Sequence, residues 1–184
     1  MKPAVFFDRD GTLIKAVHYL NDPGQVALID GVGQVLTELE QAGYLRIIVT
    51  NQAAIGKGLL TVDGLHQVQQ RLDDLLAVEG ASIDGWYFCP EVRVAADDET
   101  IDFPDRKPGP GMLLQAAGDF DISLADSWMV GDRLSDALAG KNANCRGSII
   151  ITPGTELQSH PAVDFVVASI GHVNEIILGS CDPA

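Results

Sequence analysis

The chain is organised around residues 4–13, AVFFDRDGTL. An apolar run as short as residues 4–7, with two aromatic side chains, indicates a buried β-strand rather than a helix. Gly11 interrupts the strand, so Asp8 and Asp10 are expected at its carboxyl end, where open α/β sheets bind ligands. Two carboxylates there can hold a divalent cation, and one can act as a nucleophile while the other transfers a proton. Taken alone, the segment is equally compatible with an Asp-Gly turn that carries two solvated acids.

Length and composition are those of one soluble globular domain over residues 1–184. The chain has 46% hydrophobic and 21% charged residues, which suffices for a sizeable core. It contains no apolar run long enough to cross a bilayer and no hydrophobic signal-peptide core at its N-terminus. The three cysteines are scattered and odd in number, which suits a reducing compartment. We therefore expect a cytoplasmic location and no membrane partner.

The acidic character of the chain limits its partners. A formal net charge of −14 repels nucleic-acid phosphates, so neither DNA nor RNA is expected as a partner. A protein this acidic that handles an anion needs a local positive site, built from a metal ion or from placed Lys and Arg side chains.

Short apolar runs alternate with segments of helical periodicity along the chain. The expected strands cover residues 4–7, 45–49, 86–89, 127–130, 148–152 and 164–168. The expected helices cover residues 31–42, 61–80, 111–118, 133–143 and 170–178. We expect loops over residues 15–29, 53–58 and 90–110. The alternation predicts a three-layer α/β/α sandwich with a mostly parallel, Rossmann-like sheet and no room for a second domain.

Six polar residues are predicted to converge at one edge of that sheet. They are Asp8, Asp10, Thr50, Lys107, Asp132 and Asp136. The first five follow predicted strands or lie in the loops that leave them, and Asp136 lies one helical turn later. Because the carboxyl ends of parallel strands share one edge, these side chains are expected to meet there.

This set of residues suits phosphoryl transfer. Asp8 would attack phosphorus and form an aspartyl-phosphate that water then hydrolyses, with Asp10 as general acid and base. Mg²⁺ held by Asp8 and Asp132 would neutralise charge on the phosphoryl oxygens. Thr50 would donate hydrogen bonds to those oxygens, and Lys107 would add a fixed positive charge.

Each of these residues also has a purely structural interpretation. Thr50 can simply end a strand, Lys107 can be a solvated loop residue, and Asp132 can cap the following helix. Asp136 can lie on the solvated face of that helix. Their joint occurrence, in this order and after these strands, favours the functional interpretation.

The four segments that carry these residues resemble the four motifs of the haloacid dehalogenase-type phosphatases. They read DRDGT at residues 8–12, TNQ at 50–52, RKP at 106–108 and GDRLSD at 131–136. The match is closer to the branch that contains the heptose bisphosphate and histidinol-phosphate phosphatases, which lacks a separate cap domain. The resemblance covers nearly the whole chain.

The resemblance implies a role for each matching residue. Asp8 would be the nucleophile, Asp10 the general acid/base, and Thr50 and Lys107 phosphate ligands. Mg²⁺ would be bound by Asp8, the Asp10 backbone carbonyl and Asp132, with Asp136 in support. Further substrate contacts are implied for Asn51, Gln52, Lys57 and Arg106.

The chain departs from the family pattern in one loop. Many members bind zinc through cysteine and histidine residues before the RKP motif, whereas here only Cys89 remains, followed by Pro90 and Glu91. One thiolate cannot make a tetrahedral zinc site, so no structural zinc is expected. The loop would then be held by packing of Phe103 and its prolines, or be mobile. Its acids, at 97–99, 102 and 105, are expected to be solvated rather than to bind another metal.

These observations predict a Mg²⁺-dependent phosphomonoesterase that acts as a monomer on a small phosphorylated metabolite. The resemblance favours D-glycero-D-manno-heptose 1,7-bisphosphate, hydrolysed at its 7-phosphate. Histidinol phosphate or another small phosphate ester is the alternative, and a non-catalytic phosphate-binding module is a second one. His18 and Tyr19, in the loop over residues 15–29, are further candidates for substrate contact.

Overall fold

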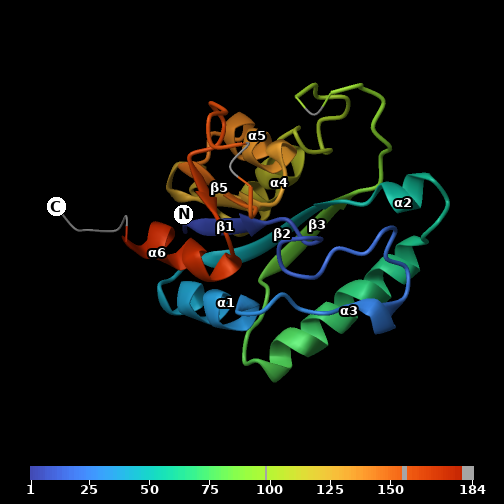
Figure 1. Ribbon diagram of the computed structural model, residues 1–184, viewed down its shortest axis with the longest axis horizontal. Coiled ribbons are helices and arrows are strands. Elements are labelled where there is room, and N and C mark those ends of the chain that lie inside the picture. Colours follow the sequence, from blue (N-terminus) through green and yellow to red (C-terminus); the bar gives the residue numbers. More distant parts are fainter. Residues whose placement is uncertain (98, 155–156, 180–184) are drawn as a thin grey trace.

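The computed structural model describes residues 1–97, 99–154 and 157–179, and it contains one six-stranded parallel sheet (Figure 1). Its strands are β1 (Ala4–Phe7), β2 (Leu45–Asn51), β3 (Gly85–Cys89), β4 (Trp128–Gly131), β5 (Gly147–Ile151) and β6 (Phe165–Val167). They lie in the order β3-β2-β1-β4-β5-β6. All six predicted strands are therefore confirmed, with small shifts at their ends.

Helices connect the strands and cover both faces of the sheet. They are α1 (Val32–Gln41), α2 (Ala53–Gly56), α3 (Val62–Val78), α4 (Gly111–Phe120), α5 (Leu134–Asn142) and α6 (Val173–Gly179). Short 3-10 turns lie at Pro23–Gln25, Leu124–Asp126 and Ile170–His172. Among the described residues, no helix combines the length and the apolar character that a bilayer span requires.

Two hydrophobic clusters join these helices to the sheet, one on each face. On one face, side chains of α1, α3 and α6 pack against residues such as Phe7 and Ile48 of the strands. On the other face, α4 and α5 pack against Phe6, Ile47 and Met129. Figure 1 shows the resulting three layers, with α4 and α5 above the sheet and α1, α3 and α6 below it. The predicted α/β/α sandwich is confirmed.

Two details of the predicted elements are wrong. The segment over residues 53–58, expected to be a loop, contains the short helix α2. The helix expected to end at Gly118 continues to Phe120 and ends where Asp121 adopts a left-handed conformation with φ of 53°. Gly118 is tolerated inside that helix because a glycine there weakens a helix without preventing it.

The strand order places the predicted site at the centre of the sheet. β1 pairs with β2 on one side and with β4 on the other. The connections on the two sides of β1 therefore diverge, and this leaves a crevice at the carboxyl end of β1. Asp8 directly follows β1 and Asp132 directly follows β4.

A buried serine fastens β1 to the segment that leads into β4. Ser127 is fully buried; its Oγ accepts a hydrogen bond from the Ala4 amide at 2.9 Å and donates one to the Ser123 carbonyl at 2.6 Å. The two strands that carry Asp8 and Asp132 are thus tied together at their amino ends.

We predict that Ser127→Ala destabilises the protein by about 1–3 kcal/mol, because it leaves the buried Ala4 amide without an acceptor. The free energy of unfolding from urea titration measures the effect. Ser82→Ala, at an exposed serine, is the matched control and is expected to change stability by less than about 0.5 kcal/mol. Equal stabilities of the two variants would contradict this role.

Candidate active site

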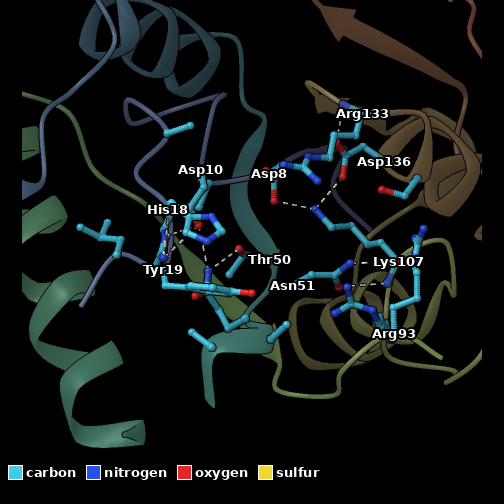
Figure 2. A pocket seen from close by; sticks show the side chains of 18 of the residues that line it. Asp8, Asp10, His18, Tyr19, Thr50, Asn51, Arg93, Lys107, Arg133 and Asp136 are labelled. Atoms are coloured by element: carbon cyan, nitrogen blue, oxygen red, sulfur yellow. Dashed lines mark hydrogen bonds and ion pairs between the residues drawn. The ribbon is translucent and has the colours of Figure 1, made fainter. Parts of the chain in front are cut away.

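A cavity of about 600 Å³ opens at the carboxyl edge of the sheet, where the predicted residues meet (Figure 2). Its lining includes Arg106 and five of the six residues predicted to converge: Asp8, Asp10, Thr50, Lys107 and Asp136. Asn51 and Gln52 lie in its wall as well. Residues from β1, β2, the loop after β3 and α5 are therefore brought together, as the sequence predicted.

Three carboxylates form a compact group, of which two, Asp8 and Asp136, line this cavity, whereas Asp132 is absent from its described lining. Asp8, Asp132 and Asp136 each offer an oxygen, and these oxygens lie within 4.8 Å of one another. Two glycines make room for them, because a Cβ on Gly11 would overlap the Asp132 carboxylate and one on Gly131 would overlap that of Asp136. Gly11 also has φ of +94°, which favours glycine.

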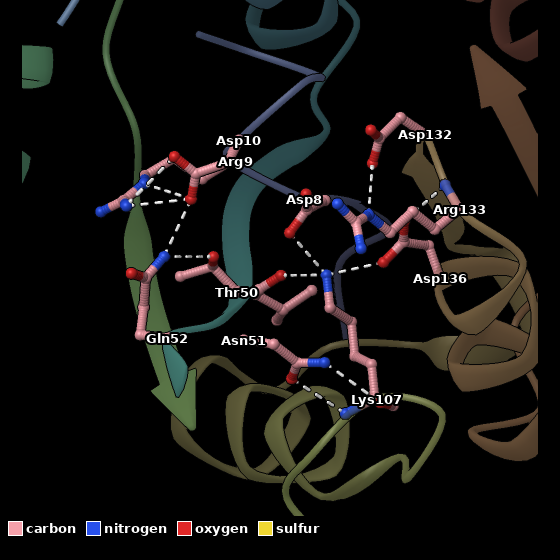
Figure 3. Close-up of polar contacts among 11 residues, drawn as sticks. Asp8, Arg9, Asp10, Thr50, Asn51, Gln52, Lys107, Asp132, Arg133 and Asp136 are labelled. Atoms are coloured by element: carbon pink, nitrogen blue, oxygen red, sulfur yellow. Dashed lines mark hydrogen bonds and ion pairs between the residues drawn. The ribbon is translucent and has the colours of Figure 1, made fainter. Parts of the chain in front are cut away.

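Lys107 holds two of the three carboxylates (Figure 3). Its Nζ lies 2.6 Å from Asp8 Oδ1 and 2.7 Å from Asp136 Oδ1, and it donates to the Val49 carbonyl at 2.8 Å. These contacts use all three of its N–H donors. Burial alone would lower the pKa of Lys107, but the charges of Asp136 and Asp8 outweigh burial and raise it. The ammonium is therefore charged, and it orients Asp8 directly.

Asp132 is the member of this group that lacks a close cation. Arg133 Nε lies 3.9 Å from Asp132 Oδ1, and that buried oxygen accepts no hydrogen bond in the described structure. Burial, followed by repulsion from Asp8 and Asp136, raises the pKa of Asp132 to about 7. When all three carboxylates are ionised, their negative charge exceeds the single positive charge of Lys107. Clustered oxygens with this excess charge fit a hard divalent cation such as Mg²⁺.

Asp10 has different partners from Asp8. Its Oδ2 accepts hydrogen bonds from Arg9 Nη2 and from Gln52 Nε2, each at 2.9 Å. Gln52 also donates to Thr50 Oγ1 at 2.9 Å. Arg9 is fully buried, whereas the Asp10 side chain is 26% exposed. The Asp10 carboxylate is thus held in a fixed orientation on the side of the cavity that water reaches.

The other two residues of the TNQ segment have distinct positions. Thr50 is buried in the cavity wall. Asn51 exchanges two hydrogen bonds of 3.1 Å with the backbone amide and carbonyl of Lys107. Asn51 therefore fixes the backbone that carries Lys107, which is a structural role beside the substrate contact that the resemblance implied.

Of the two cations implied as further substrate contacts, one lies in the cavity wall. Arg106 lines the cavity, and its Nη1 donates to the Glu91 carbonyl at 2.7 Å. Burial, then the neighbouring charge of Arg93, lowers its pKa. Lys57 is absent from the described lining; its Nζ instead bonds the Tyr19 hydroxyl at 2.5 Å. Lys57 therefore contacts the cavity indirectly, through Tyr19, which lines the cavity together with His18.

The structure adds three arginines that the sequence interpretation did not assign. Arg9, Arg93 and Arg133 all line the cavity. Arg9 directly follows Asp8, and Arg133 directly follows Asp132. Their positions next to these acids could therefore have indicated from the sequence that they lie in the site. Arg93 lies in a segment without periodicity, and only its position after the carboxyl end of β3 pointed to the site.

The loop that lacks the zinc ligands is held by hydrogen bonds. The Asp102 carboxylate accepts from the amides of Val94 and Ala95, and Asp97 accepts from those of Glu99 and Thr100. These two acids cap the backbone rather than being merely solvated. Asp98, another member of the acidic cluster, lies outside the described residues. Cys89 is buried, and burial raises the pKa of its thiol.

Comparison with known proteins agrees with this geometry. Residues 105–173 match a family model described as HAD-hydrolase-like. The D-glycero-beta-D-manno-heptose-1,7-bisphosphate 7-phosphatase of Pasteurella multocida (strain Pm70) is 36% identical, over 97% of this chain and 98% of the relative. The Escherichia coli (strain K12) protein of the same name is 34% identical, over 99% of this chain and 97% of the relative.

Solved structures show the same fold. D,D-heptose 1.7-bisphosphate phosphatase from B. bronchiseptica, complexed with magnesium and phosphate, superposes with a TM-score of 0.82 at 26% identity, covering 97% of this chain and 99% of that one. A putative HAD-like phosphatase from Mesorhizobium loti gives 0.81 at 28% identity, covering 97% and 83%. The chain therefore belongs to the haloacid dehalogenase-like phosphatases, in the branch that contains the heptose-1,7-bisphosphate 7-phosphatases.

Proposed function

We propose that this phosphatase hydrolyses the 7-phosphate of D-glycero-β-D-manno-heptose 1,7-bisphosphate through an aspartyl-phosphate on Asp8. The observation that carries the proposal is the buried pairing of Asp8 with Lys107 next to two further carboxylates, at the end of an arginine-lined cavity. The relatives named for this activity align over nearly their whole length, which supports the substrate. We further propose that the enzyme acts in the cytoplasm as a monomer.

Asp8 supplies the nucleophile. Its Oδ1 accepts the bond from Lys107, so Oδ2 is the oxygen that attacks phosphorus. The bond between phosphorus and the sugar oxygen breaks as the bond from Oδ2 forms. The Lys107 ammonium keeps Asp8 oriented, and its positive charge stabilises the charge that develops on the phosphoryl oxygens. Thr50, from the next strand, supports those oxygens by hydrogen bonding.

Asp10 handles the proton in both steps. It donates a proton to the departing sugar oxygen and later takes one from the water that attacks the aspartyl-phosphate. Attack by that water releases inorganic phosphate and restores Asp8. Arg9 and Gln52 hold the Asp10 carboxylate in place for both transfers.

Asp8, Asp132 and Asp136 would hold Mg²⁺, with the Asp10 carbonyl as the further ligand that the family resemblance implies. When bound, the ion supplies charge neutralisation for the phosphoryl group. Asp136 already bonds both Lys107 and the Arg133 amide. We therefore assign Asp8 and Asp132 as the main protein ligands and Asp136 as their support.

The arginines support a substrate with two phosphate groups. Arg93, Arg106 and Arg133 line the same cavity as Asp8 in a protein whose formal net charge is −14. Guanidinium groups match phosphate geometry with paired donors. One phosphate would occupy the reaction centre beside Lys107, and the other would meet Arg93 and Arg106, in the loop after β3. Lys57 would act on the substrate only through Tyr19.

We predict that Asp8→Asn lowers kcat by at least about 10³-fold, because it removes the nucleophile. Phosphate release in the presence of Mg²⁺ measures the effect, and circular dichroism checks that the fold is kept. Asp30→Asn, at an exposed acid, makes the same charge change and is expected to retain full activity. Substantial activity in Asp8→Asn would remove Asp8 from its role.

We predict that Asp132→Asn raises the melting temperature of the metal-free protein at pH 8 by about 3–8 °C. A carboxyl whose folded pKa lies near 7, above its ordinary value of 3.8, destabilises the fold progressively as pH rises from about 4 to about 7. The increase in melting temperature caused by Asp132→Asn should therefore be larger at pH 8 than at pH 5. Thermal unfolding in the presence of a chelator measures it.

The same variant separates charge repulsion from metal binding. Added Mg²⁺ should raise the melting temperature of the wild type and have little effect on Asp132→Asn, because the variant has lost a ligand. A variant that is less stable than the wild type at pH 8 without metal would contradict the proposed repulsion among the three carboxylates.

We predict that, in a panel of phosphorylated metabolites assayed with Mg²⁺, the heptose 1,7-bisphosphate has the highest kcat/KM, with release of the 7-phosphate. Histidinol phosphate and hexose monophosphates are the comparison substrates, because they lack the second phosphate that would meet the arginines. A higher kcat/KM for histidinol phosphate would favour the alternative function, and a flat, low profile would reject the heptose assignment.

A further inference from the structure

The segment over residues 90–110 brings two arginines to the cavity without the help of a strand or helix. Arg93 and Arg106 both line the cavity, and the described part of the segment contains no regular secondary structure. Side-chain contacts help to position these arginines. Arg106 Nη1 donates to the Glu91 carbonyl at 2.7 Å, and Arg93 Nη1 donates to the Asp97 carbonyl at 3.1 Å.

Asp102 fastens the backbone that follows Arg93. Its Oδ2 accepts from the Val94 amide at 2.7 Å and from the Ala95 amide at 2.9 Å. These hydrogen bonds, that of Ala95 first, lower the pKa of Asp102, so the carboxylate is charged at neutral pH. The contact joins Val94 and Asp102, which are eight positions apart in the chain. The segment between them contains the Asp97 carbonyl that Arg93 contacts.

The hydrogen bonds between Asp102 and the amides of Val94 and Ala95 lie at the surface, and Asp102 does not pack in the hydrophobic core. Val94 is 81% exposed, and Asp102 is absent from the described lining of the cavity. Removing the carboxylate would therefore loosen the loop at little cost to the hydrophobic clusters on the two faces of the sheet. Its effect would fall on Arg93, the cavity residue next to the fastened amides (Figure 2).

We propose that Asp102 is a positioning residue for substrate binding, which acts by holding the Arg93 guanidinium toward the cavity. The inference rests on the proposed function, because the group that Arg93 would bind is the substrate phosphate that is not transferred. Asp102 does not touch the substrate. Its loss therefore weakens binding of a bisphosphate while leaving the chemistry at Asp8 intact.

The test compares a sugar bisphosphate with p-nitrophenyl phosphate, a monophosphate that has no second phosphate for Arg93. Asp102→Ala is expected to raise KM for the heptose bisphosphate about tenfold, the value of about one charged hydrogen bond. Its kcat for the bisphosphate, and both constants for the aryl phosphate, should stay within about twofold. Asp102→Asn keeps one acceptor oxygen and should give a smaller rise in KM.

Two further variants make the test specific. Glu99→Gln removes the same charge from the same loop, at a side chain whose contact is with His160, and should leave KM unchanged. Arg93→Ala should raise KM at least as much as Asp102→Ala. Adding Asp102→Ala to Arg93→Ala should cause no further rise, because the two residues act as one unit.

The possible outcomes distinguish a failure of the inference from a failure of the proposed function. A wild-type enzyme that is inactive on the bisphosphate would contradict the proposed function and the inference with it. An active wild type with unchanged KM in Asp102→Ala would overturn the inference alone. Equal losses on both substrates would also overturn it, because they would mean that the loop supports the whole site. Additive effects of the two substitutions would exclude action through Arg93.

Discussion

A buried lysine ammonium constrains the whole site. Lys107 is 2% exposed, and a charge this deeply buried is tolerated only when paired and hydrogen-bonded. Its partners are the Val49 carbonyl of β2, the Asp8 carboxylate after β1 and the Asp136 carboxylate of α5. Three elements that are far apart in the sequence must therefore be assembled before this charge is compensated. The contact with Lys107 that orients the Asp8 carboxylate also compensates the buried positive charge.

The distribution of charge explains how an acidic protein can bind an anion. The formal net charge of −14 acts at long range, but physiological salt screens it beyond about 8 Å. Within that distance the cavity has two different walls. The carboxylate group suits a dication, and Arg133 lies beside it, whereas Arg93 and Arg106 line the cavity away from Asp136 and would meet a second phosphate (Figure 2). Charges inside the cavity would therefore determine whether an anion binds, and the acidic surface outside it would have little effect.

The sequence predicted the sheet and the convergence of the main site residues because both follow from short-range patterns and topology. Apolar runs located the strands, and parallel pairing placed Asp8 and Asp132 at one edge. Helix α2 was missed because its four residues are too few to show helical periodicity in the sequence. The position of Arg93 and the contact between Lys57 and Tyr19 were missed because they depend on how the loops fold. Lys57 and Tyr19, for example, are 38 positions apart in the chain. Contacts of this kind depend on three-dimensional assembly and leave no spacing in the sequence.

The two acids to which we assign different roles, Asp8 and Asp10, differ in exposure rather than in pairing. Asp8 and Asp10 both contact a buried cation, Lys107 and Arg9 respectively. Their side chains are 11% and 26% exposed. A nucleophile benefits from the more enclosed position, since water there would compete for the phosphoryl group. A group that first donates a proton to a leaving oxygen and then accepts one from water must lie where water can reach it.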